Sequence, residues 1–374
     1  MIDAAFARDA DALVLGMMSG TSLDGLDLAA VRLRSGGDQP WRYELLASET
    51  VAYDEAWRGR LDAAFALDGA PADQPERELR DLDLAYGRWL GRQVGDFCDR
   101  HGLRPALVAS HGHTVHHRPA DGVTRQIGDP ATLAAASGLP VVADFRSLDV
   151  SLGGQGAPLV PVADRLLFGR YGQCLNLGGF ANVSFEYDGE RRAYDVTAVN
   201  ILLNRLAAAT GRDYDADGAL ARSGQADEAL LERLDGLPYY GRAAPKSLGR
   251  EWLEREVWPL FVAADLAPRN ALATATEHIA GQLSAALAHG PAGSVLVTGG
   301  GAYNGFLIEC TRQRLPATHE LVLPEGALID YKEAIAFALL GALRVRGEVT
   351  ALASVTGASR DSCGGVVVGL RTSG

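Results

Sequence analysis

The chain has 374 residues and a formal net charge of −12 at pH 7. The length predicts about two domains, and the composition, 47% hydrophobic and 22% charged, is ordinary for a globular protein. Binding to nucleic acid is disfavoured, because the sequence lacks the clustered Lys and Arg side chains that neutralise phosphates.

The cysteines and the apolar runs predict the compartment. The cysteines lie far apart and make no CxxC or Cys/His metal-ligand spacing, so we expect buried, reduced thiols at Cys98, Cys174, Cys310 and Cys363. The segment MIDAAFARDADAL has no basic stretch followed by a long apolar core, and no uncharged apolar run approaches about 18 residues. We therefore expect a cytoplasmic protein without a membrane span.

The chain opens with two predicted strands joined by a glycine-rich turn. Apolar runs occupy 13–18 and 26–33, and GTSLDG separates them at 20–25. Apolar residues at helical spacing predict a helix over 75–104.

Two further segments of the first half begin as buried strands. ALVASHGHTVHH (106–117) is predicted to end in a polar loop, and the segment 140–161 to run from a short strand into a glycine-rich loop.

The opening pattern returns in the second half. CLNLGGFANVSFEYDG (174–189) is again an apolar run, a double-glycine turn and an alternating strand. Residues 269–290 predict a helix that stops at glycine, and 294–307 predict a strand, a triple-glycine turn and a helix start. Two halves that each open with a glycine-turn hairpin predict a duplicated α/β domain pair.

The first turn is a candidate anion site, since successive backbone N–H groups in a tight turn form an anion-binding concavity. It is no Walker loop, because it has no Lys and leads into a strand, and it lacks the Rossmann spacing. In a hairpin cradle, hydroxyls of Ser19, Thr21 and Ser22 would add donors, and Asp24 would hold hydrated Mg²⁺. Alone, such a sequence is more often only a turn. Comparable turns at 178–179 and 299–301 favour a nucleotide site.

Several segments together resemble the anhydro-N-acetylmuramic acid kinase family. In family order they are GMMSGTSLDGLDLA (16–29), SHGHT (110–114), VVADFR (141–146), GGQGAPLVP (153–161), LNLGGFANVS (175–184), PKSLGRE (245–251), TGGGAYN (298–304) and VTGA (355–358). The resemblance implies an α/β fold of duplicated actin-like ATPase domains (ribonuclease H-like) with the nucleotide cleft between them. We expect an N-terminal lobe of residues 1–146 plus about 346–374, and a C-terminal lobe of residues 147–345.

The resemblance also implies an activity. Family members convert 1,6-anhydro-N-acetylmuramic acid, ATP and water to N-acetylmuramic acid 6-phosphate, in the recycling of cell-wall sugars. A carboxylate base would activate water toward C1, and O6, released by ring opening, would take the γ-phosphoryl group. Mg²⁺ and backbone amides would neutralise the phosphate charge. The implied partners are ATP and a small-molecule sugar, and the oligomeric state stays open between a monomer and a homodimer.

The site residues follow from the same resemblance. The family motif Phe-Asp-x-Gly-Pro-Gly-Asn falls on YDVTAVN (194–200), which makes Asp195 the implied catalytic base. The implied ATP-binding residues are Ser19, Gly20, Thr21, Ser22, Leu23, Asp24, Gly25, Leu26, Gly178, Gly179, Gly299, Gly300, Gly301 and Asn304, with Asp24 holding Mg²⁺ through water. The implied substrate-binding residues are His111, Thr114, Asp144, Arg146 and Glu333.

The assignment of Arg146 has a chemical basis, and the assignment of Glu333 has an alternative. Arg146 suits the lactyl carboxylate of a muramic sugar, because guanidinium and carboxylate groups pair in a bidentate manner. Glu333 lies either near the sugar or on a solvated helix face. The histidines His111, His113, His116 and His117 lack the spacing of a metal site.

The sequence departs from the family pattern after Asp195. Thr197, Ala198 and Val199 stand where the motif has Gly-Pro-Gly, a later family Asp is Asn204, and His113 stands where Gln is usual. We expect the altered loop to shift outward, with the Thr197 hydroxyl supplying a phosphate or water contact.

The alternative for the altered loop is a cleft that closes poorly and a slow enzyme. Two other functions remain open: a kinase for another 1,6-anhydrosugar such as levoglucosan, and a nucleotide-binding relative that has lost catalysis.

Overall fold

The computed structural model describes residues 6, 11–20, 23–35, 40–66 and 74–369. Thr21 and Ser22, both predicted to bind ATP, lie outside these residues. The chain forms two compact units, unit 1 (Met1–Leu167 with Tyr331–Gly374) and unit 2 (Phe168–Asp330). The sequence predicted lobe boundaries at 146/147 and 345/346. In the structure, unit 1 extends further: it includes the helices α5 (Ser147–Ser151) and α6 (Pro161–Leu167) and most of α14 (Gly326–Arg346).

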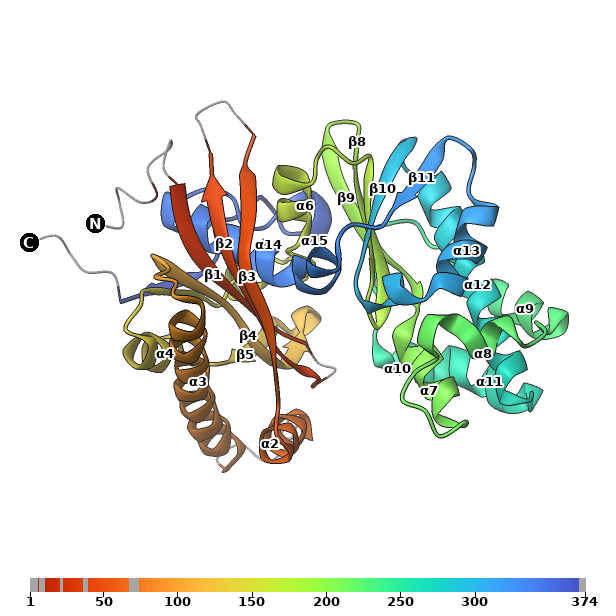
Figure 1. Cartoon of the computed structure of the whole chain (residues 1–374), viewed down its shortest axis with the longest axis horizontal. Helices are drawn as coiled ribbons and strands as arrows, with labels where there is room; N and C mark the ends of the chain where they lie inside the picture. The colour runs from red at the N-terminus through yellow and green to blue at the C-terminus, as the bar shows by residue number, and fades with distance from the viewer. Residues whose placement is uncertain (1–5, 7–10, 21–22, 36–39, 67–73, 370–374) are drawn as a thin grey trace, which may run out of the picture. The chain divides into compact units, whose positions relative to one another are not determined.

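Unit 1 is built on a mixed sheet with strand order β12-β6-β4-β1-β2-β3, and β5 pairs with β4 outside this order (Figure 1). The strands β1, β2 and β3 form an antiparallel meander, and β4 and β6 continue the sheet parallel to β1. The strands are β1 (Asp11–Ser19), β2 (Gly25–Arg34), β3 (Arg42–Ala52), β4 (Leu107–Arg118), β5 (Val123–Ile127), β6 (Val141–Ala143) and β12 (Val366–Val368).

Helices cover both faces of this sheet. Side chains alternate along a strand, so Leu15 and Met17 of β1 face one way, into a core shared with Tyr86 and Phe97 of α3. Gly16 faces the other way, where α14 approaches so closely that a Cβ would lie 1.9 Å from the Ala334 carbonyl oxygen. The remaining helices of unit 1 are α2 (Glu55–Ala66), α3 (Gln74–His101), η1 (Pro119–Asp121), α4 (Pro130–Ser137) and α15 (Ala353–Thr356).

Unit 2 is built on a five-stranded sheet with strand order β11-β10-β7-β8-β9. The strands β7, β8 and β9 again form an antiparallel meander, and β10 and β11 continue the sheet parallel to β7. The strands are β7 (Gln173–Leu177), β8 (Phe180–Tyr187), β9 (Glu190–Ala198), β10 (Gly293–Thr298) and β11 (His319–Val322).

The two sheets therefore share one plan, which confirms the predicted duplicated α/β fold. In each unit a three-stranded meander comes first in the chain, and the two later strands add in parallel to its first strand. This is the strand plan of a ribonuclease H-like domain, as the prediction of two actin-like domains requires.

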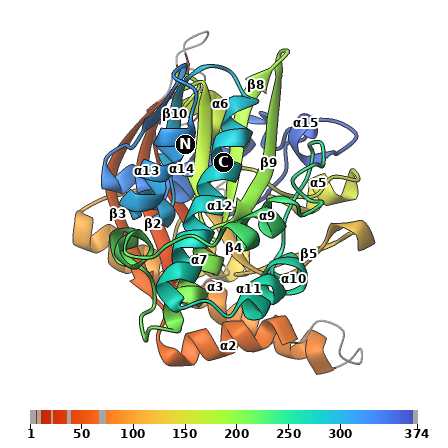
Figure 2. The same ribbon diagram turned by 90° about the vertical axis from the view of Figure 1, so that its right-hand side faces the viewer.

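In unit 2 the long helix α12 packs against β8 and β9 and against the helices α7, α8, α9 and α13 (Figure 2). Asp227 and Asn304 cap the N-termini of α9 and α13 by accepting backbone N–H groups. The helices of unit 2 are α7 (Asn200–Ala208), η2 (Ala216–Gly218), α8 (Ala219–Arg222), α9 (Glu228–Asp235), α10 (Arg250–Trp252), η3 (Leu253–Val257), α11 (Trp258–Ala264), α12 (Pro268–Ala288), η4 (Gly300–Tyr303) and α13 (Gly305–Arg314).

One predicted loop is a strand. The polar end of the 106–117 segment belongs to β4, because His113 to Arg118 pair with β5 in an antiparallel ladder. Backbone pairing with a neighbour outweighs the local polarity here. Among the described residues, no helix is long and apolar enough to cross a membrane.

Candidate active site

Asp195 lies near the end of β9, and a neighbouring segment holds it at three points. Its side-chain Oδ2 accepts a hydrogen bond from the backbone N–H of Leu248 at 2.9 Å. Its backbone N–H donates to the Lys246 carbonyl at 3.1 Å, and its carbonyl accepts from the Tyr239 hydroxyl at 2.6 Å. Burial raises the pKa of the Asp195 carboxyl to about 6, against the lowering effect of the Leu248 N–H group.

The residues that replace the family's Gly-Pro-Gly are buried, which corrects the expectation of an outward loop. Thr197, Ala198 and Val199 are at most 1% exposed, and Ala198 and Val199 belong to the core of unit 2. The Thr197 hydroxyl lies 3.0 Å from the Tyr240 hydroxyl. It therefore faces the interior of the unit and is not aimed at a phosphate or at solvent.

The double-glycine turn after β7 is open on its outer side. Gly178 and Gly179 accept backbone hydrogen bonds through their carbonyls, from the N–H groups of Asn200 and Val199 respectively. A Cβ added to Gly179 would meet nothing closer than Ile201 Cβ at 3.9 Å, which is ordinary contact. The packing of unit 2 therefore does not require glycine at this position, and the backbone is open to close approach by a ligand.

The triple-glycine turn after β10 has a packing reason. A Cβ on Gly299 would lie 2.6 Å from Asn176 Oδ1, and one on Gly301 would lie 2.7 Å from Leu177 Cβ. Gly300 is exposed, and a Cβ there would lie 3.6 Å from Asn200 Nδ2.

Asn200 and Asn304 organise the backbone around these two turns. Asn200 donates its side-chain amide to the Leu177 carbonyl at 3.0 Å, and Asn304 accepts from the Leu307 N–H at 3.0 Å as the cap of α13. Because β7 and β10 are parallel neighbours, their turns share one edge of the sheet, where ligands of open α/β sheets bind.

In unit 1 the first hairpin is only partly available for a ligand. Ser19 Oγ is 2.7 Å from the Tyr53 hydroxyl and 2.8 Å from His113 Nδ1, inside the unit. Any contribution of Ser19 to a phosphate site therefore comes from its backbone.

Of the other described residues of this turn, some are buried in the core and others are exposed. Leu26 is buried in the core, and a Cβ on Gly25 would clash with the Val51 carbonyl oxygen at 2.7 Å. Gly20 accepts a hydrogen bond from the Leu23 N–H, and Leu23 has a left-handed φ of 60°. Asp24 is exposed, so its carboxylate oxygens are accessible to a hydrated cation.

The buried His111, in the first half of β4, pairs with the half-buried Arg146, which follows β6. Arg146 donates through Nε and Nη2 to His111 Nε2 at 3.1 and 2.8 Å, and through Nη1 to the Gly156 carbonyl. Since arginine only donates, His111 Nε2 carries no proton, and Nδ1 donates to the Gly112 carbonyl. Burial, and next the charge of Arg146, lower the pKa of His111 well below its usual range, so His111 is neutral.

The other predicted sugar-site residues of unit 1 differ in how they are held. Asp144 has a left-handed φ of 56° and accepts from the Ser147 N–H and hydroxyl. Thr114 accepts from Gln126 at 3.3 Å. Glu333 is half-buried, not solvated, and burial raises its pKa while the neighbouring Lys332 lowers it.

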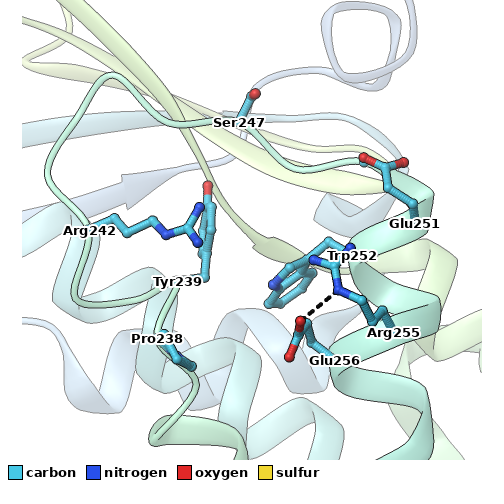
Figure 3. A pocket seen from close by; sticks show the side chains of 9 residues that line it. Pro238, Tyr239, Arg242, Ser247, Glu251, Trp252, Arg255 and Glu256 are labelled. Carbon is cyan, nitrogen blue, oxygen red and sulfur yellow. Dashed lines mark hydrogen bonds and ion pairs between the residues drawn. The ribbon is translucent and has the colours of Figure 1, made fainter.

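Unit 2 also has a pocket of about 250 Å³ beside the segment that holds Asp195 (Figure 3). Aromatic rings and charged groups share its lining, so it suits a small polar molecule with an apolar face. Arg255 and Glu256 pair across one side at 2.8 Å. The pocket is lined by Pro238, Tyr239, Arg242, Ser247, Gly249, Glu251, Trp252, Arg255 and Glu256.

Sequence reasoning missed the partners of Asp195. PKSLGRE was recognised as a family segment, but nothing in its pattern places Lys246 and Leu248 beside residue 195. Tyr239, Tyr240 and His278 carry no motif, so the bonds of the two tyrosines to β9, and of His278 to Tyr240, follow only from the fold.

The chain matches the family model described as anhydro-N-acetylmuramic acid kinase over residues 12–369. A protein with that name from Pseudomonas putida is 40% identical over 370 residues, covering 93% of this chain and 96% of its own. One from Rhodospirillum rubrum is 38% identical over 372 residues, covering 96% and 95%. A solved ROK family glucokinase from Streptomyces griseus is 13% identical with a TM-score of 0.41, covering 88% of this chain and 99% of its own.

Proposed function

The chain belongs to the anhydro-N-acetylmuramic acid kinase family, and from this premise we propose how its residues carry out the ATP-dependent reaction of that kinase. In this proposal Asp195 is the general base. The observation that carries the assignment is its half-buried carboxylate, fixed through Oδ2 by Leu248, while no hydrogen bond from the described residues reaches Oδ1. A pKa of about 6 keeps it ionised and still basic near neutral pH.

The reaction joins a hydrolysis to a phosphoryl transfer. Oδ1 of Asp195 accepts a proton as water adds to C1 of the anhydro sugar, and the bond between C1 and O6 breaks. O6 then bonds to the γ-phosphorus of ATP, and ADP leaves. The atoms sum to sugar, ATP and water giving the sugar 6-phosphate, ADP and the proton that Asp195 releases to solvent at the end of the cycle.

ATP would be held at the glycine turns. A Cβ added to Gly178 or Gly179 would make only ordinary contacts, at 3.5 Å or more, so there is room for phosphate oxygens to approach the backbone there. Mg²⁺ fits the exposed Asp24 carboxylate, since Mg²⁺ is usually held by one or two carboxylates together with waters and substrate phosphates. When bound, it would neutralise charge on the transferred phosphoryl group. We place the reaction in the cytoplasm because ATP is its phosphoryl donor.

The muramic sugar would be recognised in unit 1 by Arg146. Its Nε and Nη2 groups are turned toward His111, and one Nη1 proton is turned toward Gly156. The end of the guanidinium between Nη1 and Nη2 is then the part left for the lactyl carboxylate. Burial lowers the pKa of Arg146 only to about 10, so the group remains charged at neutral pH.

The test is to incubate the protein with ATP, Mg²⁺ and either anhydro-N-acetylmuramic acid or levoglucosan, and to analyse the products by mass spectrometry. We expect the muramic sugar to gain one phosphoryl group and one water, and to carry one ¹⁸O atom when the reaction is run in H₂¹⁸O. Product from levoglucosan alone would replace the proposed substrate. Absence of both products would show a nucleotide-binding relative without catalysis.

A further inference from the structure

A segment of unit 2 is hydrogen-bonded to the strand β9, which carries Asp195. The segment 238–249 connects α9 to α10 and bonds to all three polar parts of Asp195: the N–H, the carbonyl and the side chain. Two residues further along β9, Thr197 bonds to Tyr240 of the same segment. Asp195 thus depends on where this segment lies.

A chain of polar side chains, which runs from the exposed Asp235 to the buried His278 and Thr197, holds the segment on the side away from Asp195. The Tyr240 hydroxyl, 3.0 Å from Thr197 Oγ, is also 2.8 Å from His278 Nε2. His278 Nδ1 is 2.6 Å from Asp235 Oδ1, at the end of α9. His278 is 2% exposed and Thr197 is 1% exposed, so breaking the link at either residue would leave a buried polar atom without a partner, which is unfavourable.

We propose that the chain Asp235–His278–Tyr240–Thr197 is a positioning device that holds the 238–249 segment on β9 and so fixes the Asp195 carboxylate. The proposal rests on the role of Asp195 as base. Thr197 stands where the resembled family motif has glycine, which has no hydroxyl. The Thr197 hydroxyl therefore makes a hydrogen bond to Tyr240 that a glycine cannot make. This bond is the role that we propose for the replacement of glycine by threonine.

The electrostatics give the proposal a distinctive signature. The titratable group coupled to Asp195 is Tyr239 on the 238–249 segment, and Tyr239 in turn has Tyr194, Tyr240 and Arg242 around it. The Lys246 ammonium lies over the rings of Tyr194 and Tyr239. The Leu248 N–H group favours the ionised carboxylate and lowers its pKa. When the segment loosens, this hydrogen bond weakens but water also reaches the carboxylate, and because burial is the larger of the two effects, the pKa of Asp195 falls toward its ordinary value.

The experiment uses Thr197→Val in the full chain, which keeps the branched shape and removes the hydroxyl. We expect kcat to fall about tenfold, comparable to the loss of one hydrogen bond, with KM for ATP and for the sugar within about twofold of wild type. The acid limb of the pH profile should move to lower pH, because the carboxylate becomes less buried. Thr197→Ser, which keeps the hydroxyl, should restore both kcat and the limb.

A second readout does not need turnover. Hydrogen–deuterium exchange in the 238–249 segment should be faster in Thr197→Val than in wild type and normal in Thr197→Ser. Tyr240→Phe, which removes the hydroxyl that joins Thr197 to His278, should act in the same direction. The matched control is Thr311→Val, a buried threonine of unit 2 whose hydroxyl bonds to Leu307 within its own helix.

The outcomes separate the two proposals. A Thr197→Val protein with wild-type exchange in the segment and an unmoved acid limb would overturn the positioning role. So would Thr311→Val producing the same exchange and pH changes, because the effect would then reflect general destabilisation. A wild-type protein that forms no phosphorylated sugar defeats the proposed function, while the exchange measurement still decides whether the chain holds the segment.

Discussion

At the scale of single residues, the candidate site contains polar groups whose environments set their chemistry. Burial brings the pKa of Asp195 up to about 6, and the direct bonds from Arg146 fix His111 as a neutral acceptor. Burial therefore makes the Asp195 carboxylate more basic, and burial together with the Arg146 cation keeps the His111 imidazole neutral and oriented. His111 serves to orient Arg146 in this geometry, and its buried Nε2 has no proton to give.

The first prediction concerns the base. Asp195→Asn keeps the shape and an oxygen that accepts from Leu248, but it cannot take a proton. Turnover should fall by about two to four powers of ten, while ATP affinity, measured by calorimetry, stays near that of the wild type. An Asn variant with near-normal turnover would place the base elsewhere.

The second prediction concerns the guanidinium. Arg146→Ala should reduce transition-state binding of anhydro-N-acetylmuramic acid by about 2–5 kcal/mol, because the proposed charge pair with the lactyl carboxylate would be lost. A sugar without a carboxylate, such as levoglucosan, provides the matched measurement of kcat/KM. Equal losses on the two sugars would mean that Arg146 supports the fold around His111 and makes no lactyl contact.

At the scale of elements, the glycine turns that look alike in sequence differ in the structure. Gly25, Gly299 and Gly301 are glycines because neighbouring atoms of the same unit leave no room for a Cβ. Gly178 and Gly179 have such room. Glycine content alone therefore does not identify which turn meets a ligand, and the space around each Cβ position does.

The third prediction uses this difference. Gly179→Val adds a side chain on the open side of the turn, so the protein should fold with a Tm near that of wild type, while its Kd for ATP rises at least about tenfold, or 1.4 kcal/mol. Gly301→Ala should instead lower the Tm, because its Cβ would lie 2.7 Å from Leu177 Cβ. Unchanged ATP affinity in Gly179→Val would show that its turn is only a turn.

Local pattern predicted most elements but not their long-range partners. The two hairpins, the helix α3 and the glycine turn after β10 follow from periodicity and turn residues, and the structure has them. The polar half of β4 looked like a loop because its strand character comes from pairing with β5. The inward orientation of the Thr197 side chain could not be predicted from the sequence either, because its partner Tyr240 lies 43 positions away in the chain.

At the scale of the whole molecule, each unit contributes a different part of the proposed reaction. Unit 1 carries Arg146, with its neighbour Glu333, and the exposed Asp24, whereas unit 2 carries Asp195 and the open glycine turn. The same strand plan in both units thus supports different chemistry at the carboxyl ends of its parallel strands. Function here depends on which side chains follow each strand, and the shared fold does not determine them.

The fourth prediction is that activity and the contribution of Asp195 to stability change in opposite directions with pH. The base must be ionised, so kcat/KM should rise with pH through about 6 and then level off. The folded carboxyl has a raised pKa, so the folded state binds its proton more tightly than the unfolded chain, whose value is near 3.8. Stability from this group is therefore present below about pH 4 and is lost as pH rises through about 6.

Comparison of wild type with Asp195→Asn isolates this effect. A shift of about two pKa units corresponds to at most about 3 kcal/mol, and because the carboxylate is only half-buried, solvent screening should reduce this to about 1–2 kcal/mol. In urea unfolding the two proteins should be about equally stable at pH 4, and Asp195→Asn should be the more stable at pH 7.5. Equal stability at both pH values would mean that the carboxylate is well solvated, and a base with an ordinary pKa would then leave activity flat between pH 5 and pH 7.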